Sequence, residues 1–209
     1  MEKDGLAMQS WMTENDIEKT ILPEVNRIWR AAGVTFTLEK VIDGSALSPP
    51  DQRQLLDDIV SAHRNHKGKS DPQRIKKLSR LIDFTSESPV SIHIYLVPYL
   101  GETSQGHTQR RHRRIFIGQW SDKASKAREK PERVLLTEER PFQQGSLSRT
   151  VAHELGHVLG LKHPHKATQT VFGLLMGGKR PGYSLTPQEI EQARRQAAAL
   201  SKQFSTRTD

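Results

Sequence analysis

Residues suited to metal chemistry are concentrated in one short segment, which reads His153-Glu154-Leu155-Gly156-His157. In a helix, residues four apart share a face, so the imidazoles of His153 and His157 can converge on one cation. Glu154 lies about 100° further round the helix axis, too far to join easily as a ligand but close enough to reach water at the metal. The segment therefore predicts a divalent-metal site with a general base beside it.

The third ligand is expected just beyond the end of this helix. Gly160 can adopt the left-handed conformation that reverses the chain, which would bring His163 back towards the first two histidines. His165 is a competing ligand, although Pro164 makes ligation by both awkward. Three neutral imidazoles leave one position of a tetrahedral zinc open for water, as in catalytic sites. The sequence predicts one catalytic Zn²⁺, held by His153, His157 and His163.

The charge of such an ion would lower the pKa of its bound water to about 7. Glu154 would take the proton of this water during attack on a carbonyl and later act as proton donor. Peptide hydrolysis is the natural use of this chemistry.

The full pattern, H-E-x-x-H-x-x-G-x-x-H over residues 153–163, resembles the signature of the metzincin clan of zinc endopeptidases. The resemblance implies hydrolysis of internal peptide bonds by zinc-bound water with Glu154 as general base. It also implies a methionine turn beneath the histidines, and Met176 in Leu-Leu-Met-Gly-Gly fits that place. An ordinary core methionine is the alternative, since methionine commonly fills gaps. Some metzincins place a tyrosine two residues later; here Gly178 occupies that position, and Tyr183 is the nearest substitute.

The composition limits the number of domains and the kinds of bond that can stabilise them. With 209 residues, 34% of them hydrophobic, the chain can bury one substantial core, so we expect residues 1–209 to form one domain. The N-terminal subdomain would span 1–163, including the zinc helix, and the smaller C-terminal subdomain 164–209. The chain has no cysteine, which excludes disulfides and a zinc–thiolate site.

The signal, membrane and charge patterns of the sequence bear on the location of the protein and on its partners. The first residues lack the pattern of a secretory signal, and no apolar run approaches the ~20 residues of a membrane span, so we expect a soluble protein. The metzincin resemblance implies secretion, and the compartment stays open. The net charge is +8, with basic clusters at 63–69 and 109–114. Neither cluster has interleaved aromatics or a reading helix, so we expect solvated loops, not a nucleic-acid site. A monomer that binds a protein or peptide substrate is predicted.

Periodicity predicts the elements that must position the site. Apolar residues at helical spacing predict a core-facing helix from Thr13 to Gly33, bent or restarted at Pro23, followed by a strand at 34–38. This passage also resembles the opening of metzincin catalytic domains. Residues 51–62 and 74–82 predict short helices in a 42–90 insertion with no assigned chemistry. Residues 134–137 predict a short strand.

Two further strands are predicted at 90–97 and 114–120, with His93 as a packed or rim residue and not a ligand. In metzincins the segment between them carries an antiparallel edge strand that pairs with extended substrate. A surface hairpin, with His107 simply exposed, is the alternative. The resemblance gives these substrate-binding residues: Ser104, Gly106, His107, Thr108, Gly177 and Tyr183.

A helix at 147–159, anchored by its apolar side, would carry the zinc ligands. A capping box at Thr186 with Pro187 at the first helical position begins a final helix, which runs to about residue 204. The predicted fold class is α/β (α+β, zincin-like): a twisted mixed sheet, a long active-site helix, and a small C-terminal part with the methionine turn and final helix. A zinc-stabilised protein- or peptide-binding module without turnover is the alternative function, which the missing tyrosine and the unassigned insertion favour.

Overall fold

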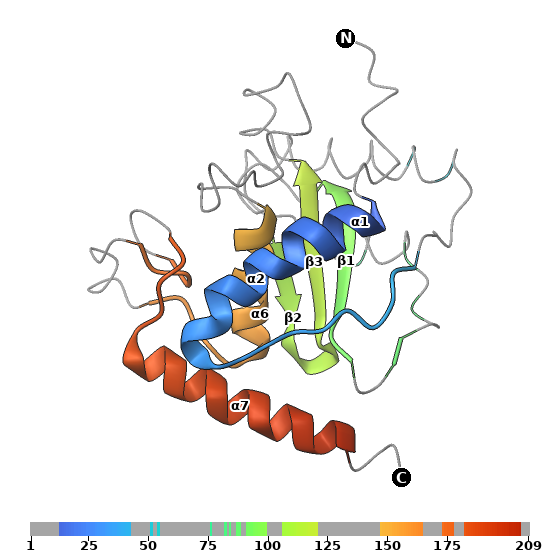
Figure 1. The fold of residues 1–209 in the computed structure, drawn as a ribbon. Coiled ribbons are helices and arrows are strands. Elements are labelled where there is room, and N and C mark those ends of the chain that lie inside the picture. The colour runs from blue at the N-terminus through green and yellow to red at the C-terminus, as the bar shows by residue number, and fades with distance from the viewer. Residues whose placement is uncertain are drawn as a thin grey trace.

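The computed structural model of the chain describes residues 13–42, 51, 54, 76, 82, 84, 87–88, 91–99, 106–120, 147–164, 173–177 and 182–205 (Figure 1). In chain order its elements are α1 (Glu14–Asp16), the π-helical turn η2 (Ile17–Ile21), α2 (Leu22–Trp29), the 3₁₀ turn η3 (Arg30–Ala32), β1 (His93–Tyr99), β2 (Gly106–Gln109), the 3₁₀ turn η5 (Arg110–His112), β3 (Arg114–Trp120), α6 (Leu147–Val158) and α7 (Pro187–Ser205).

The first helical segment begins and ends where the sequence predicts. The Thr13 hydroxyl accepts from the Asp16 amide at 3.1 Å, and the Asp16 carboxylate accepts from the Thr13 amide at 2.8 Å. The segment ends at Gly33, which is left-handed with φ 63°. The wider π turn ends at Ile21, two residues before Pro23, whose ring lacks an N–H and would clash with the carbonyl four residues earlier in a regular helix. The helical segment thus changes type at Leu22, next to the position where the sequence predicts a bend or restart.

The predicted strand at 34–38 is wrong, because the segment is extended but joins no sheet ladder in the described part of the chain. The Asn26 side chain takes the place of a neighbouring strand. Its carbonyl oxygen accepts from the Phe36 amide at 2.8 Å, and its amide nitrogen donates to the Phe36 carbonyl at 2.9 Å. Phe36 also packs edge-on against Trp29, so the alternating pattern reflects burial and not strand pairing.

The described strands form a small mixed sheet with the order β1-β3-β2. β1 and β3 are parallel, with Tyr95 opposite Phe116, and β2 is antiparallel to β3, with Thr108 opposite Ile115. The predicted bounds of β3 are confirmed, and β1 begins three residues later than the predicted 90–97. Between them in the chain, β2 is a strand antiparallel to β3. A mixed α/β fold with a three-stranded sheet bears out the predicted class at its coarse level.

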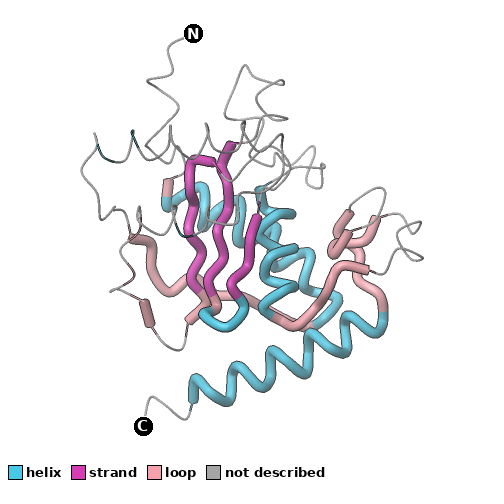
Figure 2. The backbone as a smooth tube through the Cα atoms, turned by 180° about the vertical axis from the view of Figure 1, so that it is seen from behind, coloured by secondary structure: helices cyan, strands magenta, loops and turns pink. Residues whose placement is uncertain are grey.

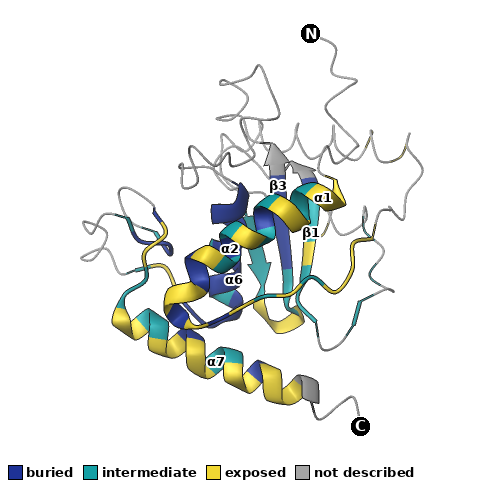
Figure 3. Cartoon of the chain, viewed as in Figure 1, coloured by how far each residue is buried: buried dark blue, intermediate teal, exposed yellow. Residues whose placement is uncertain are grey.

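One face of the sheet packs against the helices. Ile115 and Ile117 are fully buried and share the core cluster with Trp29 of α2 and Leu155 of α6. Figures 1 and 2, seen from opposite sides, show α2 and α6 on this face of the sheet. α6 is buried along most of its length, whereas α7 is exposed on much of its surface (Figure 3). The helix that carries the predicted ligands is therefore the central element of the core.

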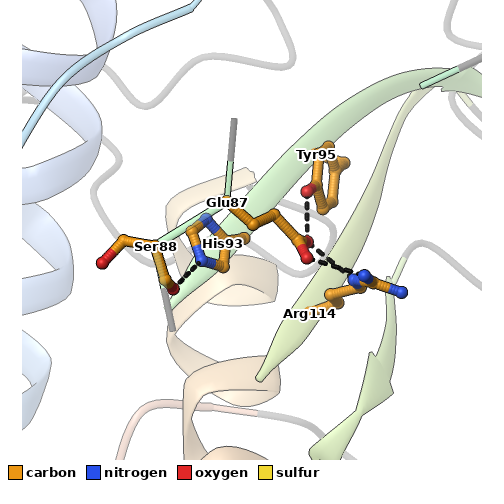
Figure 4. Close-up of polar contacts among 5 residues, drawn as sticks. All are labelled: Glu87, Ser88, His93, Tyr95 and Arg114. Atoms are coloured by element: carbon orange, nitrogen blue, oxygen red, sulfur yellow. Dashed lines mark hydrogen bonds and ion pairs between the residues drawn. The ribbon is translucent and has the colours of Figure 1, made fainter. Parts of the chain in front are cut away.

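The other face of the sheet is tied to the segment that precedes β1 (Figure 4). Arg114 donates two hydrogen bonds of 2.6 Å to the Glu87 carboxylate, and the Tyr95 hydroxyl donates to the same group. The Arg114 guanidinium lies 4.0 Å from the centre of the Phe84 ring. The His93 Nε2 donates to the Ser88 backbone carbonyl at 2.7 Å, so His93 is a packed residue, as predicted. This cluster links the segment before β1 to the side chains of β1 and β3.

The final helix is capped at its start and is hydrogen-bonded to two other segments by side chains of its first half. Thr186 and Glu189 form the predicted capping box, with bonds of 2.7 and 3.2 Å. Arg194 donates to the Ala32 carbonyl at 2.9 Å, and Gln192 donates to the Gly160 carbonyl at 2.6 Å. α7 thus connects the end of the first helical segment with the turn that follows α6.

Several sequence predictions fall outside the described residues. They are most of the helices at 51–62 and 74–82, the strand at 134–137, and residues Ser104, His165 and Gly178. Of the two helices, only Asp51, Gln54 and Lys76 are described as helical.

Candidate metal centre

The imidazoles of His153, His157 and His163 meet at one point beside α6. Their coordinating nitrogens all lie within 4.8 Å of one another. The Nε2 atom of His163 is 3.0 Å from that of His153 and 3.2 Å from that of His157. Ligands of a tetrahedral zinc with bonds of 2.0–2.1 Å would be about 3.3 Å apart. The triad is therefore close enough to bind a metal ion.

The other ring nitrogens are held by backbone carbonyls. The Nδ1 of His153 donates to the Leu175 carbonyl at 2.7 Å, and the Nδ1 of His157 donates to the Leu161 carbonyl at 3.0 Å. A carbonyl oxygen can only accept, so each Nδ1 carries the proton and each neutral ring presents an unprotonated Nε2. A proton on His163 could satisfy only one of these two lone pairs, whereas a cation satisfies all three rings. The donor set fits a divalent ion, with orienting carbonyls of the kind that support metal-bound histidines.

Burial favours the neutral form that a ligand needs. It lowers the pKa of His153 to about 4, with smaller effects from the neighbouring histidines and Arg149, although the bond to Leu175 opposes the shift. Burial also lowers the pKa of His163. Both imidazoles are therefore neutral at pH 7 and do not need to lose a proton before they coordinate.

The chain reversal after α6 forms as predicted. Gly160 has φ 87°, a conformation that favours glycine, and its amide donates to the His157 carbonyl at 3.1 Å. The Leu161 amide then donates back to the Gly156 carbonyl at 2.9 Å. This reversal places the Leu161 carbonyl at His157 and carries His163 to the other two rings.

Met176 lies directly against the ligand helix. It is fully buried, and a Cβ added to Gly156 would lie 2.5 Å from the Met176 sulfur. The residue before it, Leu175, supplies the carbonyl that holds His153. Met176 is thus a core residue, and it directly follows the residue whose carbonyl holds the first histidine.

Glu154 lies beneath the edge strand β2. It is 5% exposed, and its carboxylate accepts a 2.6 Å hydrogen bond from the Thr108 hydroxyl. Gly106 leaves the space for this carboxylate, because a Cβ at that position would overlap it. Burial raises the pKa of Glu154, and the bond from Thr108 and the charge of His163 offset part of that effect. A carboxylate with a raised pKa is suited to accept and return a proton near neutral pH.

The predicted substrate-binding residues separate into distinct groups. Gly106 and Thr108 face Glu154, whereas His107 points to the opposite face, where its ring lies 6.5 Å from that of Phe116. Gly177, with φ 135°, lies against Pro164. Tyr183 is 47% exposed, and its neighbour Ser184 pairs with Gly173 and Leu175 through backbone hydrogen bonds.

One residue of the site is missing from the sequence prediction. Arg149 is 8% exposed and donates to the Leu175 carbonyl at 3.0 Å and to the Gly182 carbonyl at 2.7 Å. Its position, four residues before His153, puts it on the same face of the helix as the first ligand. That spacing is the only signal in the sequence that could have pointed to it.

The basic run at 109–114 is partly committed to the fold. Arg114 pairs with Glu87, and Arg113 donates to Gln203 of α7 at 2.5 Å.

No helix in the described parts of the chain is long and apolar enough to cross a lipid bilayer. Comparisons with protein-family models, curated proteins and solved structures found no match to this chain. What the site can do must therefore be judged from its own geometry.

Proposed function

We propose that this chain is a zinc-dependent endopeptidase of the metzincin type. The observation that carries the proposal is the convergence of three imidazole Nε2 atoms, two of them on rings fixed by backbone carbonyls, beside a buried carboxylate. His153, His157 and His163 would hold the ion. When bound, zinc supplies Lewis acidity that polarises a substrate carbonyl and lowers the pKa of water.

Glu154 has the proton-transfer role in this proposal. Its carboxylate would accept the proton of the attacking water and deliver it to the leaving amine. Thr108 donates to one carboxylate oxygen, Oε2, which leaves the second oxygen available for the transferred proton. The hydrogen bond also restricts rotation of the carboxylate, so the reactive oxygen is held in one orientation before substrate arrives.

The edge strand supports a peptide as the substrate. Among the described strands β2 pairs only with β3, so its outer edge can offer backbone hydrogen bonds to an extended chain. Gly106 and Thr108 place this strand directly over Glu154. A peptide paired with β2 would therefore run close to both the carboxylate and the histidine triad.

The proposal is tested by digesting a peptide library and identifying the cuts by mass spectrometry, with and without a zinc chelator. We expect internal cuts that the chelator abolishes and that added zinc restores. Glu154→Gln should bind zinc normally but lose activity by about 10²–10⁴-fold, because general-base catalysis contributes that much. Undiminished cleavage by this variant would remove Glu154 from the mechanism.

A zinc-stabilised peptide-binding module without turnover is the second candidate. The observation that favours it is the cover over Glu154, which is 5% exposed and bonded to Thr108. In this case the same library would yield zinc-dependent retention of peptides and no cuts. The digestion therefore separates the two functions directly.

A further inference from the structure

Arg149 is a buried cation beside a group of residues suited to bind another cation. Arg149 is 8% exposed and lies on α6 one turn before His153. Burying a charged group costs free energy unless hydrogen bonds compensate it, and a positive charge near a divalent ion adds repulsion. We therefore expect Arg149 to make hydrogen bonds that offset these two costs.

The hydrogen bonds of Arg149 indicate that role. It donates to the Leu175 carbonyl at 3.0 Å and to the Gly182 carbonyl at 2.7 Å. These carbonyls belong to two segments that also pair with each other, since the Gly182 amide donates to the Leu174 carbonyl at 3.0 Å. One rigid, planar group thus fastens both segments to the ligand helix.

The Leu175 carbonyl is shared with the first ligand. It accepts from Arg149 and also from the Nδ1 of His153 at 2.7 Å, which a carbonyl with two lone pairs can do. The two donors are four residues apart on one helix face, so both reach the same oxygen. The position of this oxygen sets the tautomer and the direction of the His153 ring.

We propose that Arg149 is a positioning residue for the metal site, which holds the Leu175 carbonyl where it orients His153. The inference rests on the metal site of the proposed function but not on peptide hydrolysis. The proposal and simple electrostatics predict opposite changes in zinc affinity when Arg149 is replaced. If only the charge of Arg149 mattered, its neutralisation would strengthen zinc binding; if positioning dominates, the same change weakens it.

The test measures zinc affinity by competition with a chromophoric chelator for the full chain and its variants. Arg149→Met keeps the apolar stem but loses the donors, and we expect zinc to bind about 10–100-fold more weakly, the usual effect of losing an outer-shell partner. Ser148→Ala is the matched control. Ser148 is buried on the same helix, and its hydroxyl has no hydrogen-bond partner among the described residues, so affinity should not change. Unchanged or tighter binding by Arg149→Met would overturn the proposal.

Two additions keep the test decisive. Arg149→Lys retains the charge but cannot span both carbonyls, so it should also bind zinc more weakly and serves if Arg149→Met fails to fold by circular dichroism. On the metal-free chain, ¹⁵N NMR of the imidazoles should show His153 protonated at Nδ1 in the native protein and a tautomer mixture in the variants. An unchanged His153 tautomer in variants that fold would contradict the proposal even if no zinc binds. Absence of peptide cleavage would count only against the proposed function.

Discussion

At the scale of single residues, the site combines groups that the sequence identifies with groups that it does not. The spacing of His153, His157 and His163 is informative because helix geometry and one glycine turn fix where these side chains go. The roles of Thr108 and Arg149 depend on which strand and loop cross the helix. Short-range spacing does not contain that information, so it could not predict the hydrogen bond from Thr108 to Glu154 or the position of Arg149.

Thr108 offers a direct test of how Glu154 is held. Thr108→Val removes the hydroxyl that lies 2.6 Å from the carboxylate while keeping the shape of the side chain. We expect kcat to fall about 10-fold with little change in KM, because a hydrogen bond to a charged group contributes about 1.5–3 kcal/mol. The conservative change Thr108→Ser should retain most of the activity. Loss of activity in Thr108→Ser but not in Thr108→Val would show that the methyl group, and not the hydroxyl, is important.

At the scale of elements, boundaries that depend on local hydrogen bonds are predictable. Thr13 and Thr186 begin helices through their own side chains, and Gly33 and Gly160 end helical segments in the left-handed conformation. The strand predicted at 34–38 failed because its backbone partner is the side chain of Asn26. An alternating pattern reports which residues are buried, and it cannot report what the backbone pairs with.

The contact between α6 and the Met176 segment gives an element-scale prediction. Alanine is a better helix former than glycine by about 1 kcal/mol, so Gly156→Ala would stabilise an isolated helix. Here the added Cβ would lie 2.5 Å from the Met176 sulfur and 3.5 Å from the Trp29 ring. We expect a net loss of about 1–3 kcal/mol in the free energy of unfolding, measured with urea.

A double-mutant cycle supplies the control for this prediction. Met176→Ala removes the sulfur that the new methyl group would meet, so Gly156→Ala should cost less in that background. A Gly156→Ala variant that is more stable than the native chain would mean that Met176 does not pack against the ligand helix.

The cluster of Glu87, Tyr95 and Arg114 on the other face of the sheet gives a pH-dependent prediction. Burial raises the pKa of Glu87, but hydrogen bonds from Arg114 and Tyr95 and the charge of Arg114 outweigh it, so the pKa lies below its usual value. A lowered folded-state pKa stabilises the fold above the unfolded pKa of about 4.3, and this stability is lost as pH falls through the folded pKa.

The native chain should therefore exceed Glu87→Gln in unfolding free energy by about 1 kcal/mol at pH 7, and the difference should shrink towards pH 3. Urea unfolding at both pH values measures it. Glu191→Gln is the matched control, since Glu191 and Arg195 are 72% and 74% exposed and 3.9 Å apart. A Glu87→Gln difference that is the same at pH 7 and pH 3 would refute the role given to Glu87.

At the scale of the whole molecule, the candidate metal site joins parts that are distant in the sequence. α6 carries two of the three candidate ligands, the segment after Gly160 carries the third, and the Leu175 carbonyl holds the first. The sequence predicts a mixed sheet and a long active-site helix. It could not predict the strand order β1-β3-β2 or the link from Gln192 of α7 to Gly160, because these depend on non-local packing.

This arrangement predicts that zinc stabilises the whole fold. An ion that binds only the folded chain adds about 2.7 kcal/mol when its free concentration is 100 times the Kd. The melting temperature should rise with added zinc and return to its starting value with chelator, as calorimetry would show. Glu154→Gln should behave like the native chain, whereas His157→Gln should lose most of the shift. A melting temperature indifferent to zinc would exclude a site that bridges these parts.

The most direct measurement is zinc stoichiometry together with X-ray absorption at the zinc edge, on the native chain and on His163→Gln. The account predicts one zinc per chain with three imidazole nitrogens at about 2.0–2.1 Å and one further light ligand. His163→Gln should lose one of the three imidazoles and bind zinc more weakly. Retention of all three imidazoles in that variant, as ligation by His165 would produce, or a fourth protein ligand in the native chain, would contradict the catalytic site assigned to His153, His157 and His163.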